Sequence, residues 1–197
     1  MDAKALILQN VANHISLTKQ EAEIFLSFLK PVTIRKKEFL EKSGTVCRHS
    51  AFVAKGCLKG FTVDKNAVEH VLSFAPQNWW IADMYSLISQ KPGVLSIQAI
   101  DDAELLLLSK SDQELIYERL PQFERFFRIL TENSLVANQQ RLLDNLSLTA
   151  EERYENFGKK FPGLLQTVPL KDLASYIGVT PAFFSRMRNQ SLRKKLA

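Results

Sequence analysis

The spacing of hydrophobic and polar residues changes twice along the chain. Up to about residue 30, and again after Ser111, apolar residues fall at helical spacing within polar stretches. Between Val32 and Leu108, short runs rich in β-branched and aromatic residues alternate with turn-forming residues, which is typical of strands. The pattern therefore predicts a helical start, a central β domain and a helical carboxyl-terminal part.

Three capping boxes of the form Thr/Ser-x-x-Glu indicate where helices start. In each box the hydroxyl can accept the amide of the third helical residue, while the Glu side chain reaches back to the cap amide. The boxes are Thr18–Glu21, Ser111–Glu114 and Thr149–Glu152. The first predicts a helix over roughly 19–29, ended by Pro31, and a preceding helix is expected over about 3–14.

The central segment contains several candidate strands separated by turn-forming residues. The runs are Val32–Arg35, Ala51–Ala54, Leu58–Val63, Glu69–Phe74, Leu95–Ile100 and Glu104–Leu108. Short strands at such regular spacing favour an antiparallel sandwich or roll of about 75 residues.

A long helix is predicted to begin with Pro121 in its first turn and to reach about Leu146. Its apolar residues form one stripe: Phe123, Phe126, Phe127, Leu130 and Ala137. The stripe could pack on the chain's own β domain, or it could form a dimer seam, because the small residues Ser134 and Ala137 would let a second helix approach closely. A helix with so much Phe and Leu can do both, and we expect a role in dimerisation.

The segment Leu170–Gln190 has the pattern of two helices joined by a tight turn. The first helix is expected over about 170–177, with one apolar face made of Leu170, Leu173, Ala174 and Ile177. Gly178 permits the left-handed backbone that a tight turn needs. Thr180 and Pro181 are a favoured N-cap and first residue for the second helix.

The second helix is expected from Pro181 to at least Asn189, with Phe184 and Met187 buried against the first. Ala174 must be small because the two helices would cross there at a steep angle. This is the logic of a helix-turn-helix, whose second helix enters the major groove of DNA. The residues presented outward would be Thr180, Pro181, Ala182, Ser185, Arg186 and Asn189.

The excess positive charge of the chain lies in the same carboxyl-terminal part as the two-helix segment. The chain has 26 Lys+Arg against 21 Asp+Glu, a formal charge of +5. The first 146 residues carry 17 of each sign, so the nine basic and four acidic residues of the last 51 supply the whole excess. Such asymmetry indicates a polyanion-binding end. Arg186 is suited to a guanine edge or a phosphate, and the charges of Arg188, Arg193, Lys194 and Lys195 can neutralise further phosphates.

Composition excludes several classes of protein. A hydrophobic share of 46% with 24% charged residues is typical of a globular protein. No apolar run approaches the roughly 20 residues of a membrane helix, and the start of the chain does not resemble a signal peptide. We therefore expect a cytoplasmic protein without a membrane partner. Cys47 and Cys57 could pair in principle, but free buried thiols are favoured.

No pattern of an enzyme or a metal site is present. His14, His49 and His70 lack metal-ligand spacing. His49 and His70 could meet near Cys47 in three dimensions, although surface or packing roles are favoured. There is no nucleophile motif and no phosphate-binding glycine loop, and the chain has only 7 glycines. We expect no catalytic residue, no metal and no cofactor.

The two-helix segment resembles the helix-turn-helix of the Crp/Fnr family of bacterial transcription regulators, whose pattern is roughly A-x-x-x-G-[apolar]-[ST]-x-x-x-x-S-R. The residues on that pattern are Ala174, Gly178, Val179, Thr180, Ser185 and Arg186. The stretch 52–61 is similar to the family's F-x-x-x-G-x-[apolar]-[KR], and the resemblance extends over nearly the whole chain.

This resemblance implies an α+β fold in three parts. An antiparallel β-roll like a cyclic-nucleotide-binding domain is expected over 1–120, a long dimerisation helix over 121–146, and an all-α helix-turn-helix domain over 147–197. It also implies a homodimer and contact with RNA polymerase.

The chain departs from the family where cyclic AMP would bind. Members that bind it carry G-E-[apolar]-G and, further along, R-[ST]-A, whose Glu holds the ribose and whose Arg neutralises the phosphate. Aligned on Ala99, this chain has Ala82–Tyr85 and Gly93–Leu95 at those blocks. Asp83 could imitate the Glu, but Gly93 stands at the Arg position. Because a buried phosphate without a cation is costly, we expect no control by cyclic AMP.

The pair Trp79–Trp80 has two interpretations. It could roof an apolar pocket for an unidentified small-molecule effector, or it could belong to the core, which is the commoner role and the one we favour. The candidates for an effector pocket are Trp80, Asp83, Tyr85 and Leu95.

The DNA-binding end also departs from the family. Pro181 and Ala182 offer no side-chain hydrogen bonds, so Arg186 would carry most direct readout and DNA shape would supply the rest. Only Ser191–Ala197 follow, where the family often has a β-hairpin wing, so we expect a wingless member whose basic tail contacts the DNA backbone.

The sequence therefore predicts a homodimeric, sequence-specific transcription regulator that binds a near-palindromic operator and is not an enzyme. The alternative is a small-molecule or cyclic-nucleotide sensor module whose helical end contacts a protein partner. Strong salt dependence of binding would favour DNA.

Overall fold

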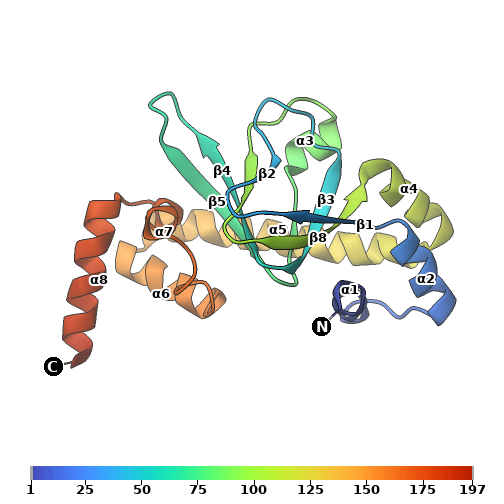
Figure 1. Cartoon of the computed structure of the whole chain (residues 1–197). Helices are drawn as coiled ribbons and strands as arrows, with labels where there is room; N and C mark the ends of the chain where they lie inside the picture. The colour runs from blue at the N-terminus through green and yellow to red at the C-terminus, as the bar shows by residue number, and fades with distance from the viewer. Residues whose placement is uncertain (1, 197) are drawn as a thin grey trace. The chain divides into compact units, whose positions relative to one another are not determined.

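The computed structural model describes the backbone of residues 2–196 and the side chains of residues 2–190. The helices are α1 (Ala3–Ala12), α2 (Lys19–Ser27), α3 (Met84–Ser89), α4 (Lys110–Arg119), α5 (Gln122–Ser147), α6 (Ala150–Lys160), α7 (Leu170–Ile177) and α8 (Pro181–Leu196) (Figure 1). The strands are β1 (Lys30–Ile34), β2 (Phe39–Glu41), β3 (His49–Lys55), β4 (Cys57–Val63), β5 (Glu69–Pro76), β6 (Trp80–Ile81), β7 (Ser96–Ala99) and β8 (Ala103–Ser109).

The strands form two four-stranded sheets. One has the order β1-β8-β3-β6 and the other the order β2-β7-β4-β5. The pairings β1–β8, β3–β8, β3–β6, β2–β7 and β4–β7 are antiparallel. The predicted α+β fold with antiparallel sheets is therefore confirmed.

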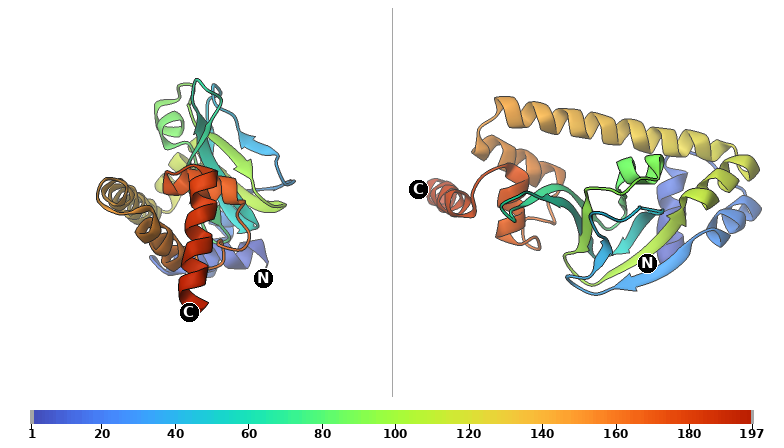
Figure 2. Two further views of the ribbon diagram at one scale, coloured as in Figure 1. Left: turned by 90° about the vertical axis from the view of Figure 1, so that its left-hand side faces the viewer. Right: turned by 90° about the horizontal axis from the view of Figure 1, so that it is seen from above.

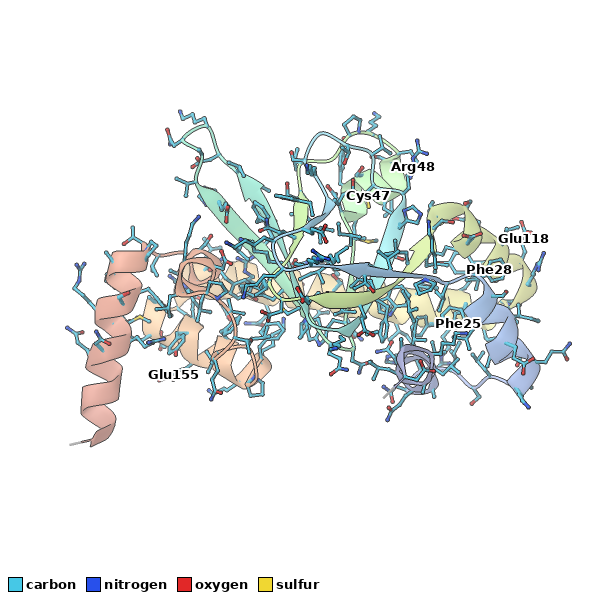
Figure 3. The ribbon with its side chains drawn as sticks, in the orientation of Figure 1. Phe25, Phe28, Cys47, Arg48, Glu118 and Glu155 are labelled. Atoms are coloured by element: carbon cyan, nitrogen blue, oxygen red, sulfur yellow. The ribbon has the colours of Figure 1, made fainter. Side chains whose placement is uncertain are left out.

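Alternating residues of β3 divide the core between the two faces of its sheet. Ala51 and Val53 pack with residues of both sheets, including Leu58 and Ile97. Phe52 points to the other face, because successive side chains of a strand alternate, and packs with α1, α2, α4 and the start of α5. In that second cluster Phe25 of α2 stacks on a ring of α5 at 4.5 Å between centroids (Figure 3).

Two of the three predicted capping boxes are present. Thr18 with Glu21, and Thr149 with Glu152, each make both the hydroxyl and the carboxylate bond. The third prediction was wrong by two residues. Ser109 caps α4 and accepts the amide of Asp112, because β8 runs directly into the helix.

Three short elements were not predicted. β2 and β6 have three and two residues, and α3 has six, so none is long enough to show a period. The strand predicted over Glu69–Phe74 also ends too early, since β5 extends to Pro76.

The apolar stripe of α5 does not lie on one surface. Phe123 and Phe126 are fully buried in the chain's own core, and Phe127 and Leu130 pack beside them. This half of the stripe therefore packs against its own β-roll side, the first of the two interpretations. Ser134 is exposed and Ala137 is half-buried.

The chain divides into two compact units. Unit 1 comprises 1–62 and 73–134, and unit 2 comprises 63–72 and 135–197. The tip of the β4–β5 hairpin thus belongs to the same unit as the carboxyl-terminal helices.

Candidate nucleic-acid interface

Helices α7 and α8 meet in a turn with the predicted backbone. Gly178 has φ of +83° and ends α7, donating its amide to the carbonyl oxygens of Ala174 and Ser175 at 3.0 and 3.1 Å. Thr180 then caps α8, its Oγ1 accepting the amide of Phe183 at 3.3 Å. The two helices cross steeply (Figure 2). Local bonds alone thus explain a sharp junction at this point.

A small core holds these helices to α6. Phe184 is fully buried and Met187 is 3% exposed. The ring of Phe184 lies edge-on to Tyr154 of α6, with centroids 5.2 Å apart. Arg153 of α6 donates from Nε to the carbonyl oxygen of Ile177 at 2.8 Å, which satisfies the carboxyl end of α7. Helices α6 and α7 therefore fix the position of α8 within unit 2.

The first helix of the pair differs from prediction at one position. Leu173, Ala174 and Ile177 are buried as predicted, but Leu170 is 39% exposed. Leu170 is the first residue of α7, so its side chain projects beyond the helix–helix contact.

The predicted DNA-contacting residues of α8 lie at the surface. Exposed side chains are those of Thr180, Pro181, Ala182, Ser185, Arg186 and Asn189, and Arg188 is half-buried. The sequence of α8 contains five Lys or Arg residues and no Asp or Glu. The whole chain excess of +5 therefore equals the charge of this one helix. Its residues 191–196 have helical backbone, and the expected tail contacts fall outside the described side chains.

Phe183 is an exposed aromatic residue that the sequence prediction did not include. It is 41% exposed and lies three residues before Arg186 on α8. With Arg186, Met187, Gln190 and Glu151 of α6 it lines an open depression of about 180 Å³. The signal was present in the sequence, because Phe183, Arg186, Met187 and Gln190 have helical spacing.

Unit 1 contains the region where the family resemblance would place a cyclic nucleotide. Asp83 is 5% exposed, and its carboxylate accepts the amides of Ser86 at 3.1 Å and Leu95 at 3.2 Å. A Cβ on Gly93 would lie 2.1 Å from Asp83 Oδ2. The carboxylate thus fills the space beside Gly93 and bonds the chain's own backbone.

The other effector-pocket candidates have different surroundings, although the Leu95 amide bonds the Asp83 carboxylate. Trp80 packs in the core with Phe52 and Phe127, at 5.5 and 5.7 Å between ring centroids, whereas Leu95 packs against the separate cluster between the sheets. Tyr85 is 59% exposed on α3. The tryptophan pair is split, since Trp79 is 40% exposed while Trp80 is half-buried and packs against the core.

The two thiols are buried and free. Burial raises the pKa of Cys57 to about 12 and raises the pKa of Cys47 as well. Cys47 lies beside α3, and its Sγ donates to the carbonyl oxygen of His49 at 3.3 Å (Figure 3). His49 and His70 were the histidines that could have met near Cys47. His70 hydrogen-bonds Asp64 in unit 2, whereas Cys47 and His49 belong to unit 1. Within residues 2–190 no group of three His, Cys, Asp or Glu side chains could hold a metal.

No helix in the described part of the chain is both long and apolar enough to span a bilayer.

Comparison with known proteins identifies the fold. The chain matches no family model and no curated protein sequence. Among solved structures, it is similar to FixK2 from Bradyrhizobium japonicum, with 19% identity, a TM-score of 0.72, and 85% and 86% of the two chains covered.

Two further regulators share this likeness. The c-di-GMP responsive global regulator CLP of Xanthomonas campestris has 13% identity and a TM-score of 0.73 over 91% of this chain and 94% of that one. The catabolite activator protein of Thermus thermophilus has 21% identity and a TM-score of 0.56 over 91% and 86%. The chain therefore has the fold of solved transcription regulators in which a cyclic-nucleotide-binding-like roll is joined to carboxyl-terminal helices.

Proposed function

We propose that this chain is a homodimeric, sequence-specific DNA-binding transcription regulator of the Crp/Fnr type. The observation that carries the proposal is the surface of α8. That helix is fixed by the turn at Gly178 and by buried Phe184, it exposes Arg186, and its sequence has five basic residues and no acidic one. Two helices joined by a three-residue turn with Gly are the arrangement that places a helix in the major groove.

A row of exposed apolar residues on α5 supports the homodimer. The residues are Leu135, Val136, Leu142, Leu143 and Leu146, between 50% and 76% exposed. They recur at steps of seven and four residues, so they share one face of the helix, as in a coiled-coil seam. This is a different set from the predicted stripe, half of which is core. A two-fold dimer implies a near-palindromic operator with half-sites about one helical turn apart.

Control by cyclic AMP in the family's usual mode is not part of the proposal. The Asp83 carboxylate stands where a cyclic phosphate needs a cation, and Gly93 leaves no room for an added side chain. A phosphate placed beside the Asp83 carboxylate would meet a like charge, and removing a phosphate from water without a cationic partner is costly.

The test of DNA binding is an operator selected from a random DNA pool, measured with the wild-type chain and with Arg186→Ala at several salt concentrations. Loss of a bidentate contact should cost about 1–3 kcal/mol of specific binding. Arg128→Ala, which removes an exposed Arg of α5, should leave the affinity unchanged. Unchanged operator affinity in Arg186→Ala contradicts the assigned role, and binding that ignores salt contradicts DNA as the partner.

The dimer is tested by Leu142→Asp, which places a charge in the middle of the exposed row. The variant should sediment as a monomer at concentrations where wild type is a dimer. Asn133→Asp places the same charge on the opposite side of α5 and should remain dimeric. A dimer that survives Leu142→Asp would require another interface.

A further inference from the structure

Arg141 of α5 joins the tip of the β4–β5 hairpin to α7 within unit 2. Its guanidinium donates to the carbonyl oxygens of Leu72 at 2.8 Å, Val71 at 2.9 Å and Tyr176 at 3.1 Å. The first two carbonyls are about 70 positions from Arg141 in sequence, and Tyr176 is 35 positions away in the other direction. One side chain thus contacts three separate segments.

The setting of this guanidinium is unusual for a surface arginine. It lies over the ring of Tyr176, with Cζ 4.3 Å from the centroid, and its Nε is buried without a hydrogen-bond partner. Burial lowers the pKa of Arg141. Burying a cation is costly, and here backbone carbonyls and an aromatic face offset part of that cost. The contact therefore depends on all three segments being in place.

A second tie joins the hairpin to the same helix. Ser175 of α7 accepts the amide of Val71 at 2.9 Å and donates to the carbonyl oxygen of Glu69 at 2.7 Å. Its hydroxyl therefore acts as the next strand would, pairing an edge of β5. Lys171 of α7 lies 3.7 Å from the carboxylate of Glu69.

The hairpin tip has its own internal support. The carboxylate of Asp64 accepts the amides of Asn66 at 2.8 Å and Val68 at 3.0 Å, and it contacts His70 at 3.0 Å. The hairpin tip is therefore held by its own hydrogen bonds as well as by its contacts with α7. Its two strands belong to the β2-β7-β4-β5 sheet.

We propose that Arg141 is a positioning residue for DNA recognition: it holds the hairpin tip 63–72 and α7 as one body, so that the state of the hairpin sets how α8 is presented. The proposal rests on the DNA-binding function proposed above. Because α7 contacts α8, and Ala174 of α7 and Phe184 of α8 are both fully buried, a displacement of α7 should move α8. Coupling of this kind is reciprocal, so operator binding at α8 must stabilise the hairpin.

The experiment is amide hydrogen exchange of the full chain with and without operator DNA, together with operator affinity. In wild type, DNA should slow exchange both in α8 and at residues 69–72. In Arg141→Gln, the DNA-dependent slowing at 69–72 should disappear while that in α8 remains, and operator affinity should fall roughly 5-fold or more. Arg128→Gln is the matched control and should behave as wild type.

A merely structural role gives a different result. It would lower the melting temperature of Arg141→Gln but leave the DNA-dependent slowing at 69–72 intact, which would overturn the proposal. Should Arg141→Gln fail to fold, Ser175→Ala removes one hydroxyl of the second tie and must weaken the same DNA-dependent slowing; an unchanged value overturns the proposal.

Failure of the proposed function is distinguishable from failure of this inference. If the wild-type chain binds no DNA, the proposed function is wrong, and the role of Arg141 is then tested by hydrogen exchange of the chain without DNA. There, Arg141→Gln must speed exchange at both 69–72 and α7, and unchanged exchange in either segment overturns the positioning role.

Discussion

The two candidate ligand regions of this molecule treat their polar groups in opposite ways. The Asp83 carboxylate is buried and accepts the amides of Ser86 and Leu95, so its hydrogen bonds are made within the β-roll. On α8 the side chain of Arg186 is exposed, and the basic residues of the helix outnumber the acidic ones by five to none. An anion would therefore meet a hydrogen-bonded carboxylate at Asp83 but an exposed guanidinium at Arg186.

This difference teaches that a shared fold does not preserve a shared site. The two-sheet roll has the fold of the solved regulators, while in this chain the carboxylate of Asp83 fills the space beside Gly93. Function must therefore be argued from the residues at each site.

The largest expected effect comes from breaking the small core that presents α8. Phe184→Ala should destabilise unit 2 by about 3–5 kcal/mol, because a fully buried ring is replaced by a cavity. Phe183→Ala, next to it in sequence but 41% exposed, should change stability by about 0.5 kcal/mol or less. Denaturant unfolding gives the free energy of unfolding of both variants, and amide hydrogen exchange in α7 and α8 shows whether these helices are the ones destabilised. Equal losses in the two variants would mean that α8 is not held by this core.

A smaller effect should come from the closed region of the β-roll. In Gly93→Ala the new Cβ would meet Asp83 Oδ2 at 2.1 Å and Ser86 Cβ at 2.9 Å. Overpacking of this kind costs about 1–3 kcal/mol. Gly163→Ala is the control, because its Cβ would meet nothing within 4 Å. If thermal melts show Gly93→Ala to be as stable as Gly163→Ala, the region around Asp83 is open and could receive a ligand.

The smallest effect compares the two capping boxes, one in each unit. Hydrogen bonds from Thr18 lower the pKa of Glu21, and hydrogen bonds from Thr149 lower that of Glu152, both from an ordinary value of 4.5. A carboxylate with a lowered pKa in the folded state stabilises above its unfolded pKa, and this contribution is lost as pH falls through the folded pKa.

The variants Glu21→Gln and Glu152→Gln keep an acceptor but remove the charge. Each should lower the melting temperature slightly at neutral pH and flatten its fall below about pH 4.5. Exchange at α2 and α6 assigns the loss to one unit. A wild-type acid profile in either variant would show that its box contributes nothing through charge.

Several features of the candidate interface were predictable from the sequence because they depend on neighbouring residues. Gly178 ends α7 and Thr180 caps α8 through bonds that span at most four positions. The observed bounds of α7 agree with the predicted 170–177. The same is true of the capping boxes at Thr18 and Thr149.

Other features could not be predicted because distant packing decided them. The predicted stripe of α5 looked continuous, yet Phe123 is buried in the core while Ala137 is only half-buried, and the exposed Leu142 lies outside that stripe. Hydrophobic spacing shows that a face is apolar, but only the neighbouring elements show which part of it is already covered. Trp79 and Trp80 likewise look alike in sequence and differ in burial.

By itself, the sequence determined the local conformations and the location of the excess positive charge in the last 51 residues. Short-range hydrogen bonds, the left-handed freedom of Gly178 and the basic composition of α8 act within a few residues. Only the tertiary structure decided that Asp83 fills the space beside Gly93, and that Arg141 reaches the carbonyls of Val71 and Tyr176. These contacts join positions far apart in the chain, so they exist only once packing has brought the segments together.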